Sequence, residues 1–209
     1  MMLKQNKIYL GDCLEIMQSI DDKSIDMILC DLPYGTTACK WDSIIPFEPL
    51  WKEYKRIMKP NTAIVLFGTE PFASQLRLSN LKMFKYDWVW LKSKSGSAFT
   101  AHYRPVNKHE MIMVFGKGKT KYNPQLTEGE PYSRNNTRYK ETRNNHAMGF
   151  KYTRTNNTGY RYPITVQYFQ QKWRRQDQLH PTQKPVELCE YLIKTYSDEG
   201  DLVLDNCCG

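Results

Sequence analysis

Three aspartates in this 209-residue sequence follow short apolar runs, and they are the first residues that suggest a chemical site. Asp12 follows "KIYLG", Asp31 follows "IDMILC" and Asp205 follows "LVL". If these runs are parallel strands, their carboxyl ends meet at one edge of a sheet, which is where open α/β sheets bind ligands. One aspartate at a strand end is common, whereas three around a shared crevice indicate a binding or catalytic site.

The segment "CDLPYG", residues 30–35, combines an acid, a proline, an aromatic ring and a glycine directly after an apolar run. Pro33 and Gly35 are turn residues and aspartate commonly begins a turn, so a simple turn is one interpretation. A chemical role for Asp31 and Tyr34 therefore needs support from the rest of the chain.

Apolar spacing predicts strands and helices in alternation along the chain. Apolar runs bounded by glycine or polar residues indicate strands, and apolar residues three or four positions apart indicate helices. Such alternation favours an α/β fold with a largely parallel sheet. The predicted strands are 7–12, 24–30, 63–68, 86–92, 110–118 and 202–205, and the predicted helices are 13–20, 46–60, 71–80 and 185–196.

Basic residues are concentrated in residues 117–176, where apolar periodicity nearly vanishes. This segment holds thirteen Lys and Arg against three Asp and Glu, whereas the rest of the chain holds seventeen against nineteen. The segment thus carries all of the excess positive charge, and a polyanion is its natural partner. A solvated basic loop is the alternative. We expect an insertion at 117–176 that lies between the two parts of one α/β domain, 1–116 and 177–209.

The composition supports a packed core and argues against several classes of protein. Hydrophobic residues make up 40% of the chain, and 14 Tyr, 8 Phe and 5 Trp supply large side chains for a core. No apolar run reaches the length of a membrane span, and the first residues do not resemble a signal peptide. The six cysteines form no C-x-x-C pair, so we expect reduced thiols in a cytoplasmic protein with no metal site.

Four segments in order along the chain make a family resemblance plain. "GDCLEIM", "DLPYG", "HPTQKPVEL" and "GDLVLDNCCG" resemble motifs of the S-adenosylmethionine-dependent DNA amino-methyltransferases. The order is that of the beta group, in which the catalytic motif precedes the cofactor motif. The resemblance implies a Rossmann-like methyltransferase sheet with residues 117–176 as the target recognition insertion, and residues 177–209 as the start of the cofactor-binding half.

The resemblance implies that Asp31, Leu32, Pro33 and Tyr34 form the catalytic segment for an adenine amine. The lone pair of this amine is delocalised into the ring, and a positioned acceptor restores electron density to the nitrogen. Asp31 would accept one amine hydrogen and the Leu32 carbonyl the other, while Tyr34 would stack on a base flipped out of the helix. Leu32 replaces the usual first proline of the motif but keeps the carbonyl, and Pro33 biases it toward an extended conformation.

The resemblance also implies a cofactor site, a DNA surface and a set of partners. Lys184 would pair with the carboxylate of the cofactor, S-adenosylmethionine. Double-stranded DNA is the implied partner, a homodimer is the assembly considered, and no membrane partner is expected. The implied cofactor-binding residues are Asp12, Cys13, His180, Thr182, Lys184, Asp205 and Gly209, and the implied DNA-binding residues are Arg134, Arg138, Arg143, Arg154, Arg161, Lys172, Arg174 and Arg175.

Three functions follow from these observations as competing hypotheses. An acid at position 31 points to adenine N6, because the cytosine-N4 enzymes of the family usually have serine there. Methylation of cytosine N4 is therefore the second hypothesis. The match to the cofactor motif stops at Gly209, inside the glycine loop, so we expect weak cofactor binding by the 209-residue form. A DNA-binding remnant without catalysis is the third hypothesis.

Overall fold

The computed structural model describes residues 3–37, 39, 42–96, 98–133, 156–171 and 183–208. The chain divides into two compact units. The first unit comprises Met1–Asn123 and Ile164–Gly209, and the second comprises Pro124–Pro163. No helix among the described residues is long and apolar enough to cross a membrane.

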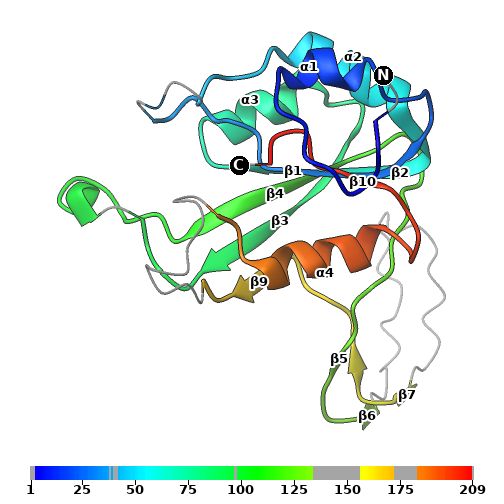
Figure 1. Ribbon diagram of the computed structural model, residues 1–209. Helices are drawn as coiled ribbons and strands as arrows, with labels where there is room; N and C mark the ends of the chain where they lie inside the picture. Colours follow the sequence, from blue (N-terminus) through cyan, green and yellow to red (C-terminus); the bar gives the residue numbers. More distant parts are fainter. Residues whose placement is uncertain are drawn as a thin grey trace, which may run out of the picture. The chain divides into compact units, whose positions relative to one another are not determined.

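A six-stranded sheet forms the centre of the first unit (Figure 1). Five of its strands run in one direction, and β4 runs against them. The prediction of an α/β fold with a largely parallel sheet is therefore confirmed. In order across the sheet, the strands are β10 (Val203–Leu204), β1 (Ile25–Cys30), β2 (Met58–Gly68), β4 (His109–Phe115), β3 (Phe84–Lys92) and β9 (Val166–Phe169).

Helices cover both faces of this sheet, as Figure 1 shows. The helices α1 (Cys13–Met17), α2 (Phe47–Ile57) and α3 (Phe72–Ser79) lie on one face, and α4 (Val186–Tyr196) lies on the other. A short 3₁₀ turn, η1 (Ala98–Thr100), lies between β3 and β4.

Alternation along the strands explains this three-layer arrangement, because successive side chains of a strand point to opposite faces. In β2, Ile64 and Leu66 pack with the residues of α2 and α3. Their neighbours Val65 and Phe67 pack with Leu188 and other residues of α4. Both faces of the strand are thus buried, as the continuous apolar run at 63–68 predicts.

Two strand predictions differ from the structure. Residues 7–12 form no strand, and Ile8 and Leu10 are exposed, with relative accessibilities of 85% and 105%. An apolar run becomes a strand only where a neighbour pairs with its backbone, and within the described residues no sheet strand pairs with this run. Conversely, β9 lies inside the predicted insertion and pairs in parallel with the edge of β3.

Two helix boundaries also differ from the predictions. The first helix ends at Met17 and not at residue 20. The helix α2 ends at Ile57, where the chain turns directly into β2 with Met58, so that Pro60 lies in the strand and not at the end of the helix. Helix ends are set by local capping and by tertiary contacts, which a periodic apolar pattern does not record.

The second unit contains two small antiparallel ladders. It spans Pro124–Pro163, which is a shorter segment than the insertion expected at 117–176. The guanidinium of Arg161 lies 4.7 Å from the centre of the Tyr132 ring and donates hydrogen bonds to the Asn157 side chain and the Glu130 carbonyl. Arg161 therefore joins parts of this unit. The ladders pair β5 (Thr127–Glu128) with β8 (Tyr160–Arg161) and β6 (Tyr132–Ser133) with β7 (Asn156–Asn157).

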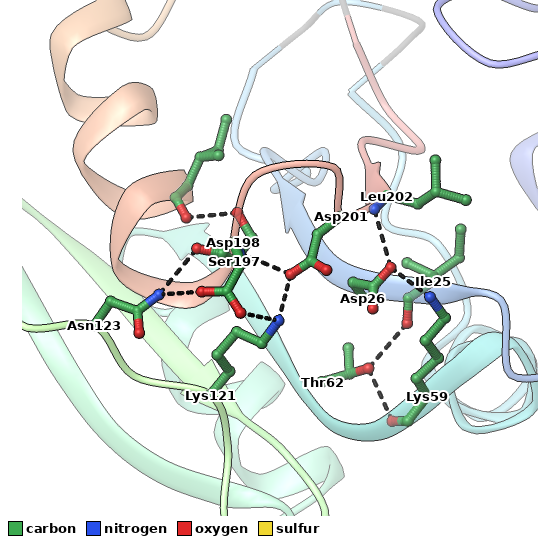
Figure 2. Close-up of polar contacts among 11 residues, drawn as sticks. Ile25, Asp26, Lys59, Thr62, Lys121, Asn123, Ser197, Asp198, Asp201 and Leu202 are labelled. Atoms are coloured by element: carbon green, nitrogen blue, oxygen red, sulfur yellow. Dashed lines mark hydrogen bonds and ion pairs between the residues drawn. The ribbon is translucent and has the colours of Figure 1, made fainter.

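Ion pairs fix the end of the sheet at which β1 begins (Figure 2). The ammonium of Lys121 lies 2.8 Å from Asp198 and 2.5 Å from Asp201, which stand in the turn before β10. At the start of β1, the carboxylate of Asp26 accepts hydrogen bonds from Lys59 at 2.6 Å and from the backbone N–H of Leu202 at 3.0 Å. These contacts hold β10 beside β1 and so position the opposite end of both strands.

Candidate functional site

Two of the three predicted aspartates lie together at the carboxyl edge of the sheet. Asp31 directly follows β1 and Asp205 directly follows β10. The two strands are parallel neighbours, with Met27 opposite Val203 and Ile28 opposite Leu204. The topology therefore brings both carboxylates to the edge at which sheets of this class bind ligands.

Asp12 was predicted to end a strand, but it follows no strand and instead lies at the start of α1. Its carboxylate caps α1 by accepting hydrogen bonds from the backbone N–H groups of Leu14 at 2.8 Å and Glu15 at 3.3 Å. The next residue, Cys13, lies beside Cys207, and hydrogen bonding to Cys207 together with burial raises the pKa of the Cys13 thiol. The segments around Asp12 and Asp205 thus meet, and the Cys13 thiol stays protonated.

The Asp31 carboxylate has a hydrogen-bond donor on each oxygen. The Tyr34 hydroxyl donates to Oδ1 at 2.5 Å, and the Lys184 ammonium donates to Oδ2 at 2.5 Å. The Asp31 side chain is 29% exposed, so part of the carboxylate still faces solvent. The predicted partner of Lys184 was the cofactor carboxylate, whereas its partners in the structure are carboxylates of the protein.

A second carboxylate, Glu110 at the start of β4, lies beside the first. Its Oε1 atom is 2.8 Å from the Tyr34 hydroxyl and 3.1 Å from the Lys184 ammonium, and its Oε2 atom is 2.6 Å from the Lys92 ammonium. Burial raises the pKa of Glu110, but Lys184 and Lys92 lower it by more, so the pKa lies below its ordinary value. Glu110 is therefore ionised at neutral pH.

The same surroundings determine the protonation of Tyr34 and Lys184. Burial, followed by the charges of Glu110 and Asp31, raises the pKa of Tyr34 well above its ordinary value. Burial lowers the pKa of Lys184, but Glu110 and Asp31 raise it by more. The site at neutral pH thus contains a protonated hydroxyl and an ammonium, and both donate to carboxylates.

The loop after Tyr34 is held by Asp42. This buried carboxylate accepts hydrogen bonds from the backbone N–H groups of Gly35 at 2.8 Å, Thr36 at 2.9 Å and Thr37 at 2.7 Å. Gly35 has φ +66°, and a Cβ atom there would lie 2.9 Å from Ile44. A glycine is therefore required where the chain turns away from residues 31–34.

Leu32 and the ring of Tyr34 pack against the core. Leu32 is buried, and the Tyr34 ring stacks on Phe72 with 5.0 Å between ring centres and 28° between ring planes. One face of the Tyr34 ring is thus covered by the protein. In place of a regular turn, the chain bends at Gly35, directly after the acid and the aromatic ring.

The structure groups the predicted site residues into three sets. Asp12, Cys13, Asp31, Leu32, Pro33, Tyr34, Lys184 and Asp205 lie in the first unit, toward the carboxyl edge of the sheet. Arg161 lies in the second unit. His180, Thr182, Gly209, Arg134, Arg138, Arg143, Arg154, Lys172, Arg174 and Arg175 lie outside the described residues.

Sequence reasoning missed three residues of this region: Lys92, Glu110 and Asp42. The signal for Glu110 was a charged residue at the head of the apolar run "MIMVF", and the signal for Lys92 was a lysine at the end of "WVWL". A charge at the end of a buried strand needs a partner, which makes it a candidate for a site. Asp42 had no such signal, because its partners are backbone groups.

This arrangement can bind and orient an amine. An ionised carboxylate is an acceptor with room for several hydrogen bonds, and Asp31 uses its two oxygens for one donor each. Its exposed part can take an N–H from a ligand. The ammonium and hydroxyl beside it hold the carboxylate in place before a ligand arrives.

Comparison with known proteins connects this geometry to one family. The N6_N4_Mtase family, described as DNA methylase, matches residues 25–209. The chain is 26% identical to the type II methyltransferase M.HpaI of Haemophilus parainfluenzae, covering 95% of this chain and 62% of that protein. It is also 26% identical to the DNA adenine methyltransferase YhdJ of Escherichia coli, covering 95% of this chain and 70% of that protein. The chain thus spans less than two thirds of M.HpaI.

Solved structures share the fold. M1.HpyAVI, crystallised as its SAM complex, superposes with a TM-score of 0.56 at 21% identity, over 94% of this chain and 80% of that one. The PvuII DNA methyltransferase, specific for cytosine N4, gives a TM-score of 0.62 at 14% identity, over 94% and 72%. At this identity the likeness bears on the fold alone, and it confirms the predicted Rossmann-like sheet. The family match over residues 25–209 establishes that the chain belongs to the N6_N4_Mtase family of DNA methylases.

Proposed function

We propose that this chain carries the catalytic site of a DNA methyltransferase that transfers a methyl group from S-adenosylmethionine to adenine N6 of a flipped base. The observation that carries the proposal is the Asp31 carboxylate at the carboxyl edge of β1, fixed between Tyr34 and Lys184 and beside Asp205. The name of YhdJ, a DNA adenine methyltransferase, supports adenine as the substrate base.

In this proposal the catalytic segment acts on the amine by orientation. Asp31 accepts one amine hydrogen and the Leu32 carbonyl accepts the other, which aligns the nitrogen lone pair for methyl transfer. In this scheme the Tyr34 ring, which stacks on Phe72 and has the Lys184 ammonium 5.7 Å from its centre, lies beside the flipped base. Base flipping is required because neither the amine nor the ring face is accessible inside the stacked duplex.

The residues near Asp205 suit the assigned methyl donor. The Asp205 carboxylate is exposed and accepts one backbone N–H, from Cys207 at 2.9 Å. A carboxylate here fits the ammonium or hydroxyl groups of S-adenosylmethionine, and Asp12 supplies a second acid nearby. When bound, the cofactor supplies an electrophilic methyl group. His180, Thr182 and Gly209 remain predicted cofactor contacts outside the described residues.

Double-stranded DNA is the proposed substrate, and the basic residues of 117–176 are its proposed contacts and target readers. Arginine favours guanine and asparagine favours adenine at base edges of the major groove. A homodimer and a cytoplasmic location complete the proposal; the homodimer rests on the resemblance, and the location rests on the resemblance and the cysteine pattern.

The proposal is tested by locating the transferred label. The chain is incubated with S-adenosylmethionine carrying a tritiated methyl group and with unmethylated genomic DNA, and the DNA is digested to nucleosides. We expect label in N6-methyladenine. Label in N4-methylcytosine would support the cytosine hypothesis, and DNA binding without transfer would support the non-catalytic one.

The variant Asp31→Ala should lower transfer by about 10²-fold or more while DNA binding is retained, because one directional acceptor is lost. The matched control is Asp22→Asn, an exposed acid whose partner is Arg56. It should transfer at the wild-type rate. Wild-type activity of Asp31→Ala would contradict the assigned role.

A further inference from the structure

Asp31 and Glu110 compete for the same two donors. The Lys184 ammonium lies 2.5 Å from Asp31 Oδ2 and 3.1 Å from Glu110 Oε1. The Tyr34 hydroxyl lies 2.5 Å from Asp31 Oδ1 and 2.8 Å from Glu110 Oε1. A hydroxyl has a single hydrogen, so Tyr34 donates to one of the two carboxylates at a time. Small movements therefore decide which carboxylate each donor serves.

The contacts of Asp31 oppose its use as an acceptor for a target amine. An ammonium 2.5 Å away neutralises the carboxylate charge and occupies Oδ2. A neutralised carboxylate is a weaker acceptor for the N–H of a substrate. The resting arrangement thus needs a second place for the Lys184 ammonium when the amine arrives.

Glu110 provides that place at low energetic cost. Its side chain is 4% exposed and is anchored through Oε2 by Lys92 at 2.6 Å, which leaves Oε1 facing Lys184 and Tyr34. Lys184 is 12% exposed, so it needs a charged partner throughout, because an unpaired buried ammonium is costly. When the Lys184 ammonium moves from Asp31 to Glu110, it keeps a charged partner throughout.

We propose that Glu110 is a positioning residue of the methyl-transfer site. It takes over the Lys184 ammonium and the Tyr34 hydroxyl when the target amine donates to Asp31. Glu110 touches neither the base nor the methyl donor in this scheme, and it acts through Lys184 and Tyr34. This inference rests on the proposed function and assigns to Lys184 a role at the base-binding carboxylate.

The kinetic test compares Glu110→Gln, Lys184→Gln and the double variant under single-turnover conditions with labelled S-adenosylmethionine and unmethylated genomic DNA. Glutamine keeps the shape of glutamate but carries no negative charge, so it cannot neutralise an ammonium. We expect Glu110→Gln to lower the transfer rate about 10–100-fold with little change in DNA affinity. The double variant should lose much less than the product of the two single losses, because Glu110 acts in part through Lys184. Multiplied losses in the double variant would overturn the proposal.

Glu53→Gln is the matched control. Glu53 is a largely buried glutamate of α2, with a basic partner, Arg56 at 2.7 Å, and it has no contact with Asp31, Tyr34 or Lys184 in the described residues. The change removes the same charge away from the site, so the transfer rate should stay at the wild-type value. A transfer rate for Glu53→Gln as low as that of Glu110→Gln would show that loss of a buried charge destabilises the protein in general, and it would contradict the inference.

A measurement independent of activity uses nuclear magnetic resonance of the lysine ammonium groups. The Lys184 signal, identified by its loss in Lys184→Gln, should shift when DNA is added to the wild type and stay in place in Glu110→Gln. Equal shifts in both proteins would overturn the proposal. If the wild type transfers no methyl group to DNA, the proposed function itself fails; if the wild type and Glu110→Gln transfer equally, only this inference fails.

Discussion

At the scale of single residues, the site depends on side chains that hold the backbone as much as on those that face a ligand. Asp31 and Tyr34 directly precede residues 35–37, whose three backbone N–H groups donate hydrogen bonds to the Asp42 carboxylate. Burial raises the pKa of Asp42, while hydrogen bonds from Thr37 and from the backbone of residues 35–37 lower it by more, below the ordinary 3.8. Asp42 therefore stabilises the folded loop more strongly in its ionised form than in its protonated form.

Asp42→Asn should lower the free energy of unfolding by about 1–3 kcal/mol at pH 7, since the amide accepts through one atom only. A lowered pKa in the folded state means that the stabilisation is present above the unfolded pKa and is lost as pH falls through the folded pKa. The difference between wild type and variant should therefore shrink below about pH 3.8. Urea unfolding midpoints at pH 7 and pH 3 measure it.

The exposed acid Asp22 again provides the control, because Asp22→Asn should change stability by less than about 0.5 kcal/mol. If the unfolding midpoints of wild type and Asp42→Asn differ by the same amount at both pH values, the ionised Asp42 carboxylate is not the source of the stabilisation.

At the scale of elements, α4 is the helix that links the network at Asp31 to the sheet. Lys184 stands just before it, and Leu188 and Leu192 are buried against the sheet. At the other end of the helix, the Tyr196 hydroxyl accepts a hydrogen bond from the Trp88 indole at 2.5 Å and shares one with Tyr86 at 2.9 Å. These contacts attach the C-terminal end of the helix to β3.

Tyr196→Phe should lower the free energy of unfolding by about 1–3 kcal/mol, because the buried indole N–H of Trp88 loses its acceptor. For a chain of this size the thermal midpoint should fall by roughly 2–4 °C for each kcal/mol. Circular dichroism and tryptophan fluorescence follow the transition. Tyr168→Phe, at an exposed position of β9, is the control and should leave the midpoint unchanged. A wild-type midpoint for Tyr196→Phe would argue against this anchoring.

At the scale of the whole molecule, charge is divided unevenly along the chain. The net charge is +8, yet residues outside 117–176 carry slightly more acid than base. A surface that binds DNA releases counterions for each phosphate it neutralises, so its affinity falls with salt. The basic segment is where we expect that dependence to arise.

Replacement of Arg134, Arg138, Arg143 and Arg154 by glutamine should weaken DNA binding and flatten its salt dependence. The slope of log affinity against log salt should shrink by up to about 0.9 for each phosphate contact removed. Fluorescence anisotropy of labelled duplex DNA from low to moderate salt gives the slopes. The control replaces the exposed Lys52, Lys55, Lys82 and Lys85, which lie outside the segment. If the two quadruple variants show the same slope of log affinity against log salt, the basic segment is not part of the DNA interface.

The sequence by itself determined the family and the class of fold, and it predicted a catalytic segment at residues 31–34. The family match confirms the resemblance that rests on four ordered motifs. Apolar runs such as 63–68 and 110–115 became buried strands, because the alternation of side chains is a property of the local chain and needs no knowledge of its neighbours. The site at Asp31 followed from the same rule, since an acid after a buried strand lies at the edge of a sheet.

Only the tertiary structure decided which elements pair and which charges meet. Residues 7–12 have the composition of a strand but no partner within the described sheet, while β9 pairs with β3 from inside a polar segment. Glu110 lies 76 positions from Tyr34, and Lys184 lies 153 positions from Asp31, so no local pattern links them. Their contact depends on strand order and on the helix after Lys184. Pairing of buried charges is a property of three-dimensional packing, and periodicity along one chain does not encode it.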